Sequence, residues 1–256
     1  MAILLTATRA WRSLIPLVRN PRVVMPLALG SIFLAINWGV YVYSVESNQL
    51  LEASLGYFIN PLVSVALGVI VLREQLRRAQ WVAIGIAIAA VLVMSITLGS
   101  PPWISLILAV SFGIYGLLKK QVNIGSAQSL TIDTAVLTPI ALVIIVSGFV
   151  RGGSAFGHVG AGTEILFILL GPVTAIPLLL FGAAARRLPL STVGALQYST
   201  PIMQFILGIT VFGEAMPLGR WIGFAMVWVA LILFTVDAIR QTRRSAADEL
   251  AVTAPD

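Results

Sequence analysis

Long apolar runs separated by short polar loops dominate the chain. Eight such runs, each of 17 to 23 residues, cover positions 23–45, 52–72, 80–98, 102–118, 130–150, 164–185, 190–212 and 218–239. At about 1.5 Å per helical residue, these lengths match the hydrocarbon core of a bilayer. Lipid offers no hydrogen-bond partner, so a spanning segment is a helix or part of a closed barrel, and the alternation of barrel strands is absent. The pattern predicts an all-α, polytopic membrane protein with eight transmembrane helices.

The composition supports this class. Of the 256 residues, 59% are hydrophobic and 10% are charged, and the mean hydropathy is +0.99. Soluble domains carry about 25% charged residues, so a water-soluble globule of this size lacks the polar surface it needs. These values exclude a cytosolic enzyme and a disordered tail. The absence of cysteine excludes a secreted disulfide module.

The basic residues give the expected orientation. Fourteen of the 16 Lys and Arg lie before the first run, in alternate loops or in the tail, whereas the other loops hold Arg151 and Arg220. Lys and Arg collect in cytoplasmic loops. The distribution therefore predicts that both termini are cytoplasmic and that the number of spans is even. Residues 1–22 form a basic segment that is either an interfacial helix or the remnant of a lost one.

A motif recurs at an offset of 140 residues, first as Pro61, Gly68, Glu74 and Trp81 and then as Pro201, Gly208, Glu214 and Trp221. The two copies lie an odd number of spans apart, so they face opposite sides, with Glu74 cytoplasmic and Glu214 external. Inverted repeats are typical of secondary transporters, whose binding sites lie near the membrane midplane. A proline at the same place in each copy predicts two kinked helices.

Four stretches also carry a family resemblance: EASLGYFINPLV at 52–63, SFGIYGLLKK at 111–120, QY at 197–198 and FGE at 212–214. They resemble RarD-type proteins of the EamA family, in the drug/metabolite transporter (DMT) superfamily, and the similarity runs from about residue 19 to 244. The resemblance implies two inverted five-helix repeats and export of a small metabolite or drug-like compound, driven by the proton gradient.

Aligned with that family, the chain begins at the third helix. Residues 23–98 then form a partial first repeat of three helices, residues 102–240 the second repeat of five, and residues 241–256 a cytoplasmic tail. A mis-called start, a fragment or a real truncation would each give this sequence. We expect the first, because exposing a cavity wall to lipid is costly. A real truncation would favour the alternative function, a non-transporting membrane protein of the same family.

Polar and aromatic side chains within the runs are the candidate substrate contacts. Tyr57 and Asn60 share a helix face one turn before Pro61, and the same offset gives polar residues before Pro201. Hydrogen bonds between helices, or ordinary packing, are the structural alternatives. The predicted cavity residues are Asn37, Trp38, Tyr41, Tyr57, Asn60, Gln197, Tyr198 and Thr200.

Acidic residues are candidates for coupling or for structure. Glu52 begins a run on the external side, where it either caps the helix or couples to protons. Asp133 lies three residues into a run, as a helix-dipole partner or as a proton or cation site. Glu74 and Glu214 end their runs, and we expect them to hold the adjoining loop and helix.

Other functions fit poorly. The acids Asp133 and Asp237 lie in no protease motif, and no Gly-rich phosphate loop precedes a helix. The sequence predicts no enzyme activity, no metal and no cofactor. The expected partners are a small-molecule substrate and the lipid bilayer but no nucleic acid, with a homodimer left open. The expected location is the cell inner membrane, crossed many times.

Overall fold

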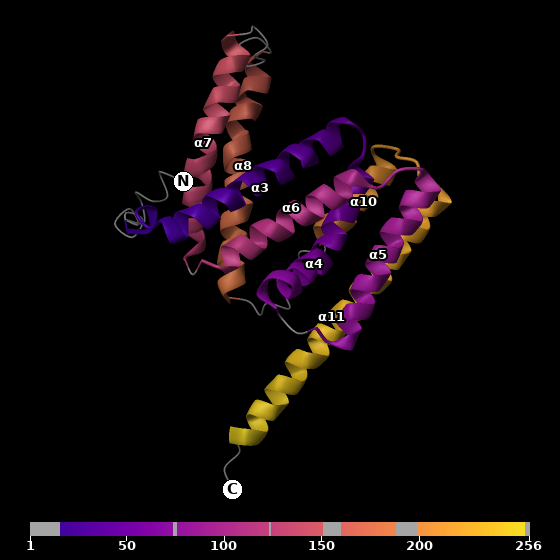
Figure 1. The fold of residues 1–256 in the computed structure, drawn as a ribbon. Helices are drawn as coiled ribbons and strands as arrows, with labels where there is room; N and C mark the ends of the chain where they lie inside the picture. The colour runs from indigo at the N-terminus through magenta and orange to yellow at the C-terminus, as the bar shows by residue number, and fades with distance from the viewer. Residues whose placement is uncertain (1–15, 74–75, 123, 151–159, 188–198, 254–256) are drawn as a thin grey trace. The chain divides into compact units, whose positions relative to one another are not determined.

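The structure, a computed structural model, describes residues 16–73, 76–122, 124–150, 160–187 and 199–253. Every regular element in these ranges is a helix (Figure 1). The helices are α3 (Pro21–Glu46), α4 (Leu50–Leu72), α5 (Arg78–Leu98), α6 (Trp103–Lys120), α7 (Ser126–Val150), α8 (Ala161–Arg187), α10 (Ser199–Thr210) and α11 (Leu218–Thr253). The all-helical class is confirmed.

Five helices are long and apolar enough to cross a membrane, over Pro21–Glu46, Leu50–Val71, Arg78–Leu98, Gln128–Val150 and Leu218–Gln241. Two further apolar segments are shorter: Trp103–Lys119 in α6 and Ala161–Thr174 in α8. The chain is therefore a multi-pass membrane protein. The number of eight spans and the cytoplasmic termini stay predictions.

Helix α11 extends well beyond the run that predicted it. Its apolar part is Leu218–Gln241, yet the helix continues to Thr253. The added residues are mostly polar or small and include neither Gly nor Pro. Nothing in this segment breaks a helix, so the helix continues after the apolar run ends.

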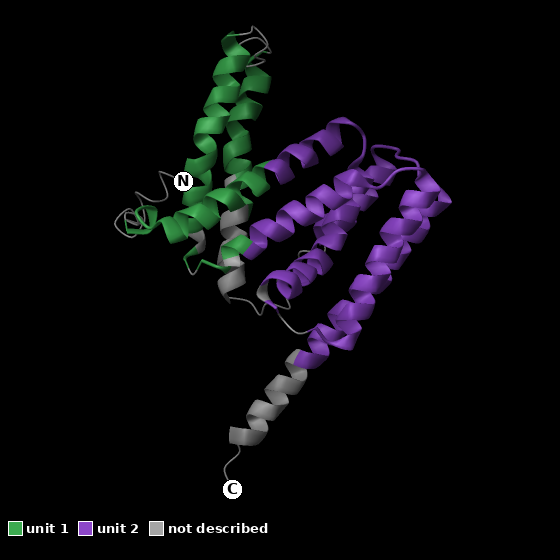
Figure 2. Ribbon diagram, in the orientation of Figure 1, with its two compact units in different colours: residues 1–35, 118–193 green, residues 36–117, 194–256 purple. Residues whose placement is uncertain are grey.

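The chain divides into two compact units (Figure 2). Unit 1 comprises residues 1–35 and 118–193, and unit 2 comprises residues 36–117 and 194–256. In unit 1, Leu27 of α3 and Ile132 of α7 are buried together, with Val23 and Val136 packed against them. The division into repeats at 23–98 and 102–240 stays a prediction.

Unit 2 is built on two helix pairs, α5 with α11 and α4 with α10. Ala83, Ala87 and Ala90 are buried at intervals of four and three residues, and such small side chains let helices approach closely. An aromatic cluster fills the space beside α4. In it the ring of Phe205 lies 4.8 Å from that of Phe224 and 5.3 Å from that of Trp228.

The repeated motif marks two similar chain reversals. After α4, Arg73 has a φ of 55° and donates its backbone N–H to the carbonyl of Gly68. At the equivalent position after α10, Gly213 has a φ of 61°, and the N–H of Glu214 donates to the carbonyl of Gly208 over 2.9 Å. A left-handed residue is a common helix ending, so the motif codes for the end of each proline-containing helix.

We predict that Gly56→Ala destabilises unit 2 by about 1–3 kcal/mol, the usual cost of overpacking. A β-carbon at Gly56 would lie 2.8 Å from the carbonyl oxygen of Ser105, where α4 crosses α6. Thermal unfolding in detergent micelles measures the effect. Gly116→Ala on α6 is the matched control, because a β-carbon there meets nothing within 4 Å. Equal unfolding temperatures for the two variants would contradict the packing described here.

Candidate functional site

A hydrogen-bond network centred on Asn37 joins three helices of unit 2. The amide nitrogen of Asn37, on α3, donates to the carbonyl of Leu108 over 2.9 Å and to the hydroxyl of Ser111 over 3.0 Å, both on α6. The hydroxyl of Tyr57, on α4, donates to Oδ1 of Asn37 over 3.4 Å. Asn37 is only 1% exposed. Its two N–H groups are therefore used by the protein, whereas its oxygen can accept a further hydrogen bond.

The predicted aromatic residues separate into two environments. The ring of Tyr41 packs edge-on against that of Tyr57, with centroids 6.1 Å apart. Trp38 is 50% exposed and stands outside the network. The structure thus brings Asn37, Tyr41 and Tyr57 together but does not add Trp38 to them.

Asn60 lies at the centre of α4, directly before Pro61. Its Oδ1 is buried and accepts no hydrogen bond from the described part of the chain. Pro61 lacks an N–H, which leaves the carbonyl of Tyr57, four residues earlier, without its helical donor. In the described part of the chain, this turn of α4 therefore carries one side-chain acceptor without a hydrogen bond and one carbonyl without its usual helical donor.

Helix α10 carries a second amide of this kind. Gln204 is 8% exposed and its Oε1 is buried without a hydrogen bond among the described residues. The α4 and α10 helices are also tied directly, because the hydroxyl of Ser54 donates to the carbonyl of Pro201 over 2.8 Å. Sequence reasoning missed Gln204. The available signal was a long polar side chain one turn after Pro201 in an otherwise apolar run.

Two of the remaining cavity candidates, Gln197 and Tyr198, lie outside the described residues. Thr200 is exposed at the start of α10. His158 and Glu74 also lie outside the described ranges. Within those ranges, no group of three His, Asp or Glu side chains is placed to hold a metal ion.

In unit 1, Asp133 forms a buried ion pair. Its Oδ2 lies 2.5 Å from Nζ of Lys119, and the hydroxyl of Ser31 donates to its Oδ1 over 3.0 Å. Asp133 is 1% exposed and lies two turns into α7, beyond the reach of the helix dipole. The spacing of these residues along the chain carried no signal for the pairing, which joins α3, α6 and α7.

Asp237 has a structural partner. Its Oδ2 lies 2.8 Å from Nε of Arg77, and this ion pair holds α11 to the start of α5.

A third polar group lies where α4 and α6 begin. The carboxylate of Glu214, from the loop before α11, accepts hydrogen bonds from the backbone N–H of Leu51 at 3.1 and 3.2 Å. Burial raises the pKa of Glu214 above its ordinary value of 4.5, while backbone N–H donors and Arg220 oppose the shift. Arg220 also lies 4.0 Å from the carboxylate of Glu52.

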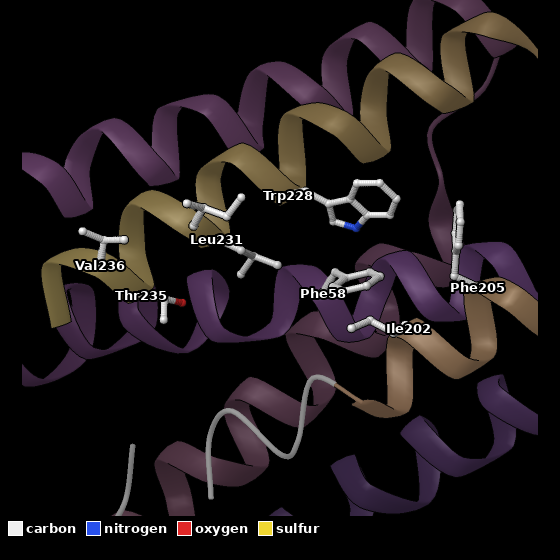
Figure 3. Close-up of a pocket in the computed structure, with 8 residues that line it drawn as sticks. Phe58, Ile202, Phe205, Trp228, Leu231, Thr235 and Val236 are labelled. Atoms are coloured by element: carbon white, nitrogen blue, oxygen red, sulfur yellow. The ribbon is translucent and has the colours of Figure 1, made fainter. Parts of the chain in front are cut away.

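An open apolar groove of about 540 Å³ lies between α4, α10 and α11 (Figure 3). Figure 3 shows the side chains of Phe58, Phe205 and Trp228 toward one end and Thr235 and Val236 toward the other. Thr235 is the polar residue in its lining. Specific recognition of a polar molecule needs several placed polar groups. We therefore locate the candidate site at the amides of α3, α4 and α10 and not in this groove.

A multi-pass membrane protein that buries amides and an ion pair within its spans has the features of a membrane transporter. The model of the EamA-like transporter family matches residues 1–96 of the chain. Protein RarD of Streptomyces exfoliatus is 51% identical over 255 residues, which are 100% of this chain and 81% of that protein.

Two further relatives agree. Protein RarD of Escherichia coli is 41% identical over 96% of this chain and 83% of its own length. The uncharacterized transporter YojE of Bacillus subtilis is 44% identical over 92% of this chain and 78% of its own length. The chain belongs to the RarD-type proteins of the EamA family, in the drug/metabolite transporter superfamily. This membership indicates a membrane transporter rather than an enzyme.

We predict that Asp133→Asn destabilises the protein by about 3 kcal/mol, because it leaves the ammonium of Lys119 without its carboxylate. The value is at the lower end for a buried pair, since the Lys119 side chain keeps 25% exposure. Adding Lys119→Met to Asp133→Asn should recover most of the loss, because the isolated charge is then removed. Denaturant unfolding in micelles measures both changes. A double variant no more stable than Asp133→Asn would contradict the ion pair.

Proposed function

We propose that this chain is a secondary transporter that moves small metabolites or drug-like compounds across the cell inner membrane by alternating access. The family resemblance supports export driven by the proton gradient. The proposed substrate site comprises Asn37, Tyr57 and Asn60, together with Gln204. Gln197 and Tyr198 are proposed members of the same site from the sequence repeat.

The observation that carries the proposal is the buried amide oxygen of Asn60, which accepts no hydrogen bond from any residue that the structure describes. A buried acceptor without a hydrogen bond costs about 1–3 kcal/mol. Within a membrane span, lipid cannot relieve this cost. Asn60 is nevertheless placed on the turn where Pro61 frees a further carbonyl. A bound substrate that donates a hydrogen bond to this oxygen would remove the cost.

The chemistry of these groups defines the class of substrate. The oxygens of Asn37, Asn60 and Gln204 are acceptors, so they suit a molecule that presents amine, amide or hydroxyl donors. The edge-on ring pair of Tyr41 and Tyr57 borders the same network and suits an apolar or aromatic portion. A small amphipathic molecule combines both features.

Coupling is proposed for the acids within the spans. Asp133 is buried in α7, where an ionisable group is by default a candidate for moving protons or cations. Its contact with Lys119 places a cation beside this carboxylate. Glu52 is the second candidate. Its carboxylate accepts a hydrogen bond from the N–H of Ile104, where α6 begins.

We predict opposite effects of Asn60→Leu on transport and on stability. Substrate counterflow in proteoliposomes, screened over a broad metabolite set, should fall by about three- to tenfold, the value of one or two neutral hydrogen bonds. The free energy of unfolding should rise by about 1 kcal/mol or more, because an unsatisfied acceptor is replaced by an apolar group of similar size.

Ser64→Ala is the matched control, because Ser64 is an exposed polar residue one turn further along α4. It should leave counterflow and stability unchanged. If Asn60→Leu keeps full counterflow, the proposed site is wrong. If every metabolite exchanges no faster than in empty vesicles, the transporter proposal fails and the non-transporting alternative gains.

A further inference from the structure

The first turn of α4 is buried and has no cap of its own. Gln49 precedes the helix but makes no side-chain hydrogen bond to it. Leu50, Leu51 and Ala53 are 3%, 0% and 0% exposed. The first N–H groups of a helix have no acceptor within it. The acceptor must come from elsewhere in the protein.

Glu214 supplies that acceptor from a segment 163 residues away in the sequence. Both of its carboxylate oxygens lie within 3.2 Å of the N–H of Leu51, and it also accepts from the N–H of Leu50. Gly208 allows the approach, because a β-carbon there would lie 2.9 Å from the Leu51 side chain. Gly208 also holds the backbone of Glu214 through its carbonyl.

The same contacts extend to α6 and α11. Glu52 follows Leu51 and accepts a hydrogen bond from the first turn of α6. Its backbone carbonyl accepts from the hydroxyl of Ser105 over 2.6 Å. Arg220, on α11, lies 4.0 Å from the Glu52 carboxylate and donates to the carbonyl of Ala215 over 2.9 Å. Glu214, Glu52 and Arg220 together therefore link α4, α6, α11 and the loop after α10.

The space beneath these charges is closed. Leu51, Leu55, Leu98 and Phe224 line a gap below Glu52 and Arg220 in which no water molecule fits. Glu52 and Arg220 line the same gap, so this end of unit 2 is closed to water there.

We infer that the Glu214 carboxylate is the clamp that closes this end of unit 2, and that it leaves the first turn of α4 whenever this end opens during transport. The inference rests on the proposed function, and the predicted topology places this end outside the cell. Glu214 is a positioning residue in this account: it holds helices and touches no substrate.

The clamp responds to protons in a defined direction. The charged groups facing Glu214 among the described residues are Arg220 and Glu52, and burial is the largest influence on it. Because burial raises the pKa of the clamped carboxyl above that of an exposed one, the clamped form binds a proton more tightly. Protonation at acidic pH therefore favours the closed end, and deprotonation favours opening.

The test uses the absence of cysteine from the natural chain. Leu55→Cys introduces one thiol below the clamp, at a residue 1% exposed. Its modification by a membrane-impermeant maleimide, applied to each face of sealed vesicles, measures opening. Adding Glu214→Ala should speed modification about ten- to a hundredfold, as expected from losing hydrogen bonds to a charged acceptor. Glu46→Ala, an exposed carboxylate before the same helix, should change the rate less than about twofold.

Two outcomes would overturn the clamp. One is an unchanged modification rate in Glu214→Ala. The other concerns pH: relative to the exposed thiol of Glu46→Cys, modification of Leu55→Cys should slow as the pH is lowered toward 4.5, the ordinary pKa of a glutamate, and Glu214→Gln should abolish that dependence. A dependence that persists in Glu214→Gln contradicts the role of this carboxyl, even if Glu214→Ala does not fold.

The measurement needs no substrate, so it separates the clamp from the proposed function. If the protein shows counterflow but Glu214→Ala leaves the modification rate of Leu55→Cys unchanged, the clamp alone is overturned. Accelerated modification without counterflow of any metabolite supports the clamp and overturns the transporter.

Discussion

Helix α4 runs through unit 2 with most of its first half buried, so each polar group on it depends on a partner within the protein. Leu51 finds Glu214, Ser54 finds the carbonyl of Pro201, and the carbonyl of Glu52 finds Ser105. Neither lipid nor an apolar core can replace these partners. The hydrogen bonds to these polar groups of α4 therefore position α6, α10 and the loop before α11. The aromatic cluster packs against these elements.

Because buried polar groups in unit 2 generally have partners within the protein, those without a partner are informative. Asn60 and Gln204 carry buried amide oxygens that no described residue satisfies, and they lie on the two helices that contain the repeated prolines. Departures from local consistency concentrate at functional sites. These amides are therefore the substrate contacts that we propose.

The sequence was informative about local features and uninformative about distant partners. Apolar run length predicted the helices, because it is a property of neighbouring residues. Asn37 and Asp133 stood out as polar residues in apolar runs. Their partners Leu108 and Lys119 did not, since a backbone carbonyl carries no sequence signal and a lysine near a helix end already satisfies the positive-inside rule.

The central claim is that the oxygen of Asn60 is kept for a molecule from outside the chain. A structure of the protein in lipid nanodiscs, at a resolution that reveals ordered water, tests it most directly. We predict water or bound solute within hydrogen-bond distance of Oδ1 of Asn60. A side-chain or backbone donor of the protein itself at that oxygen, in both the inward- and the outward-open states, would contradict the account.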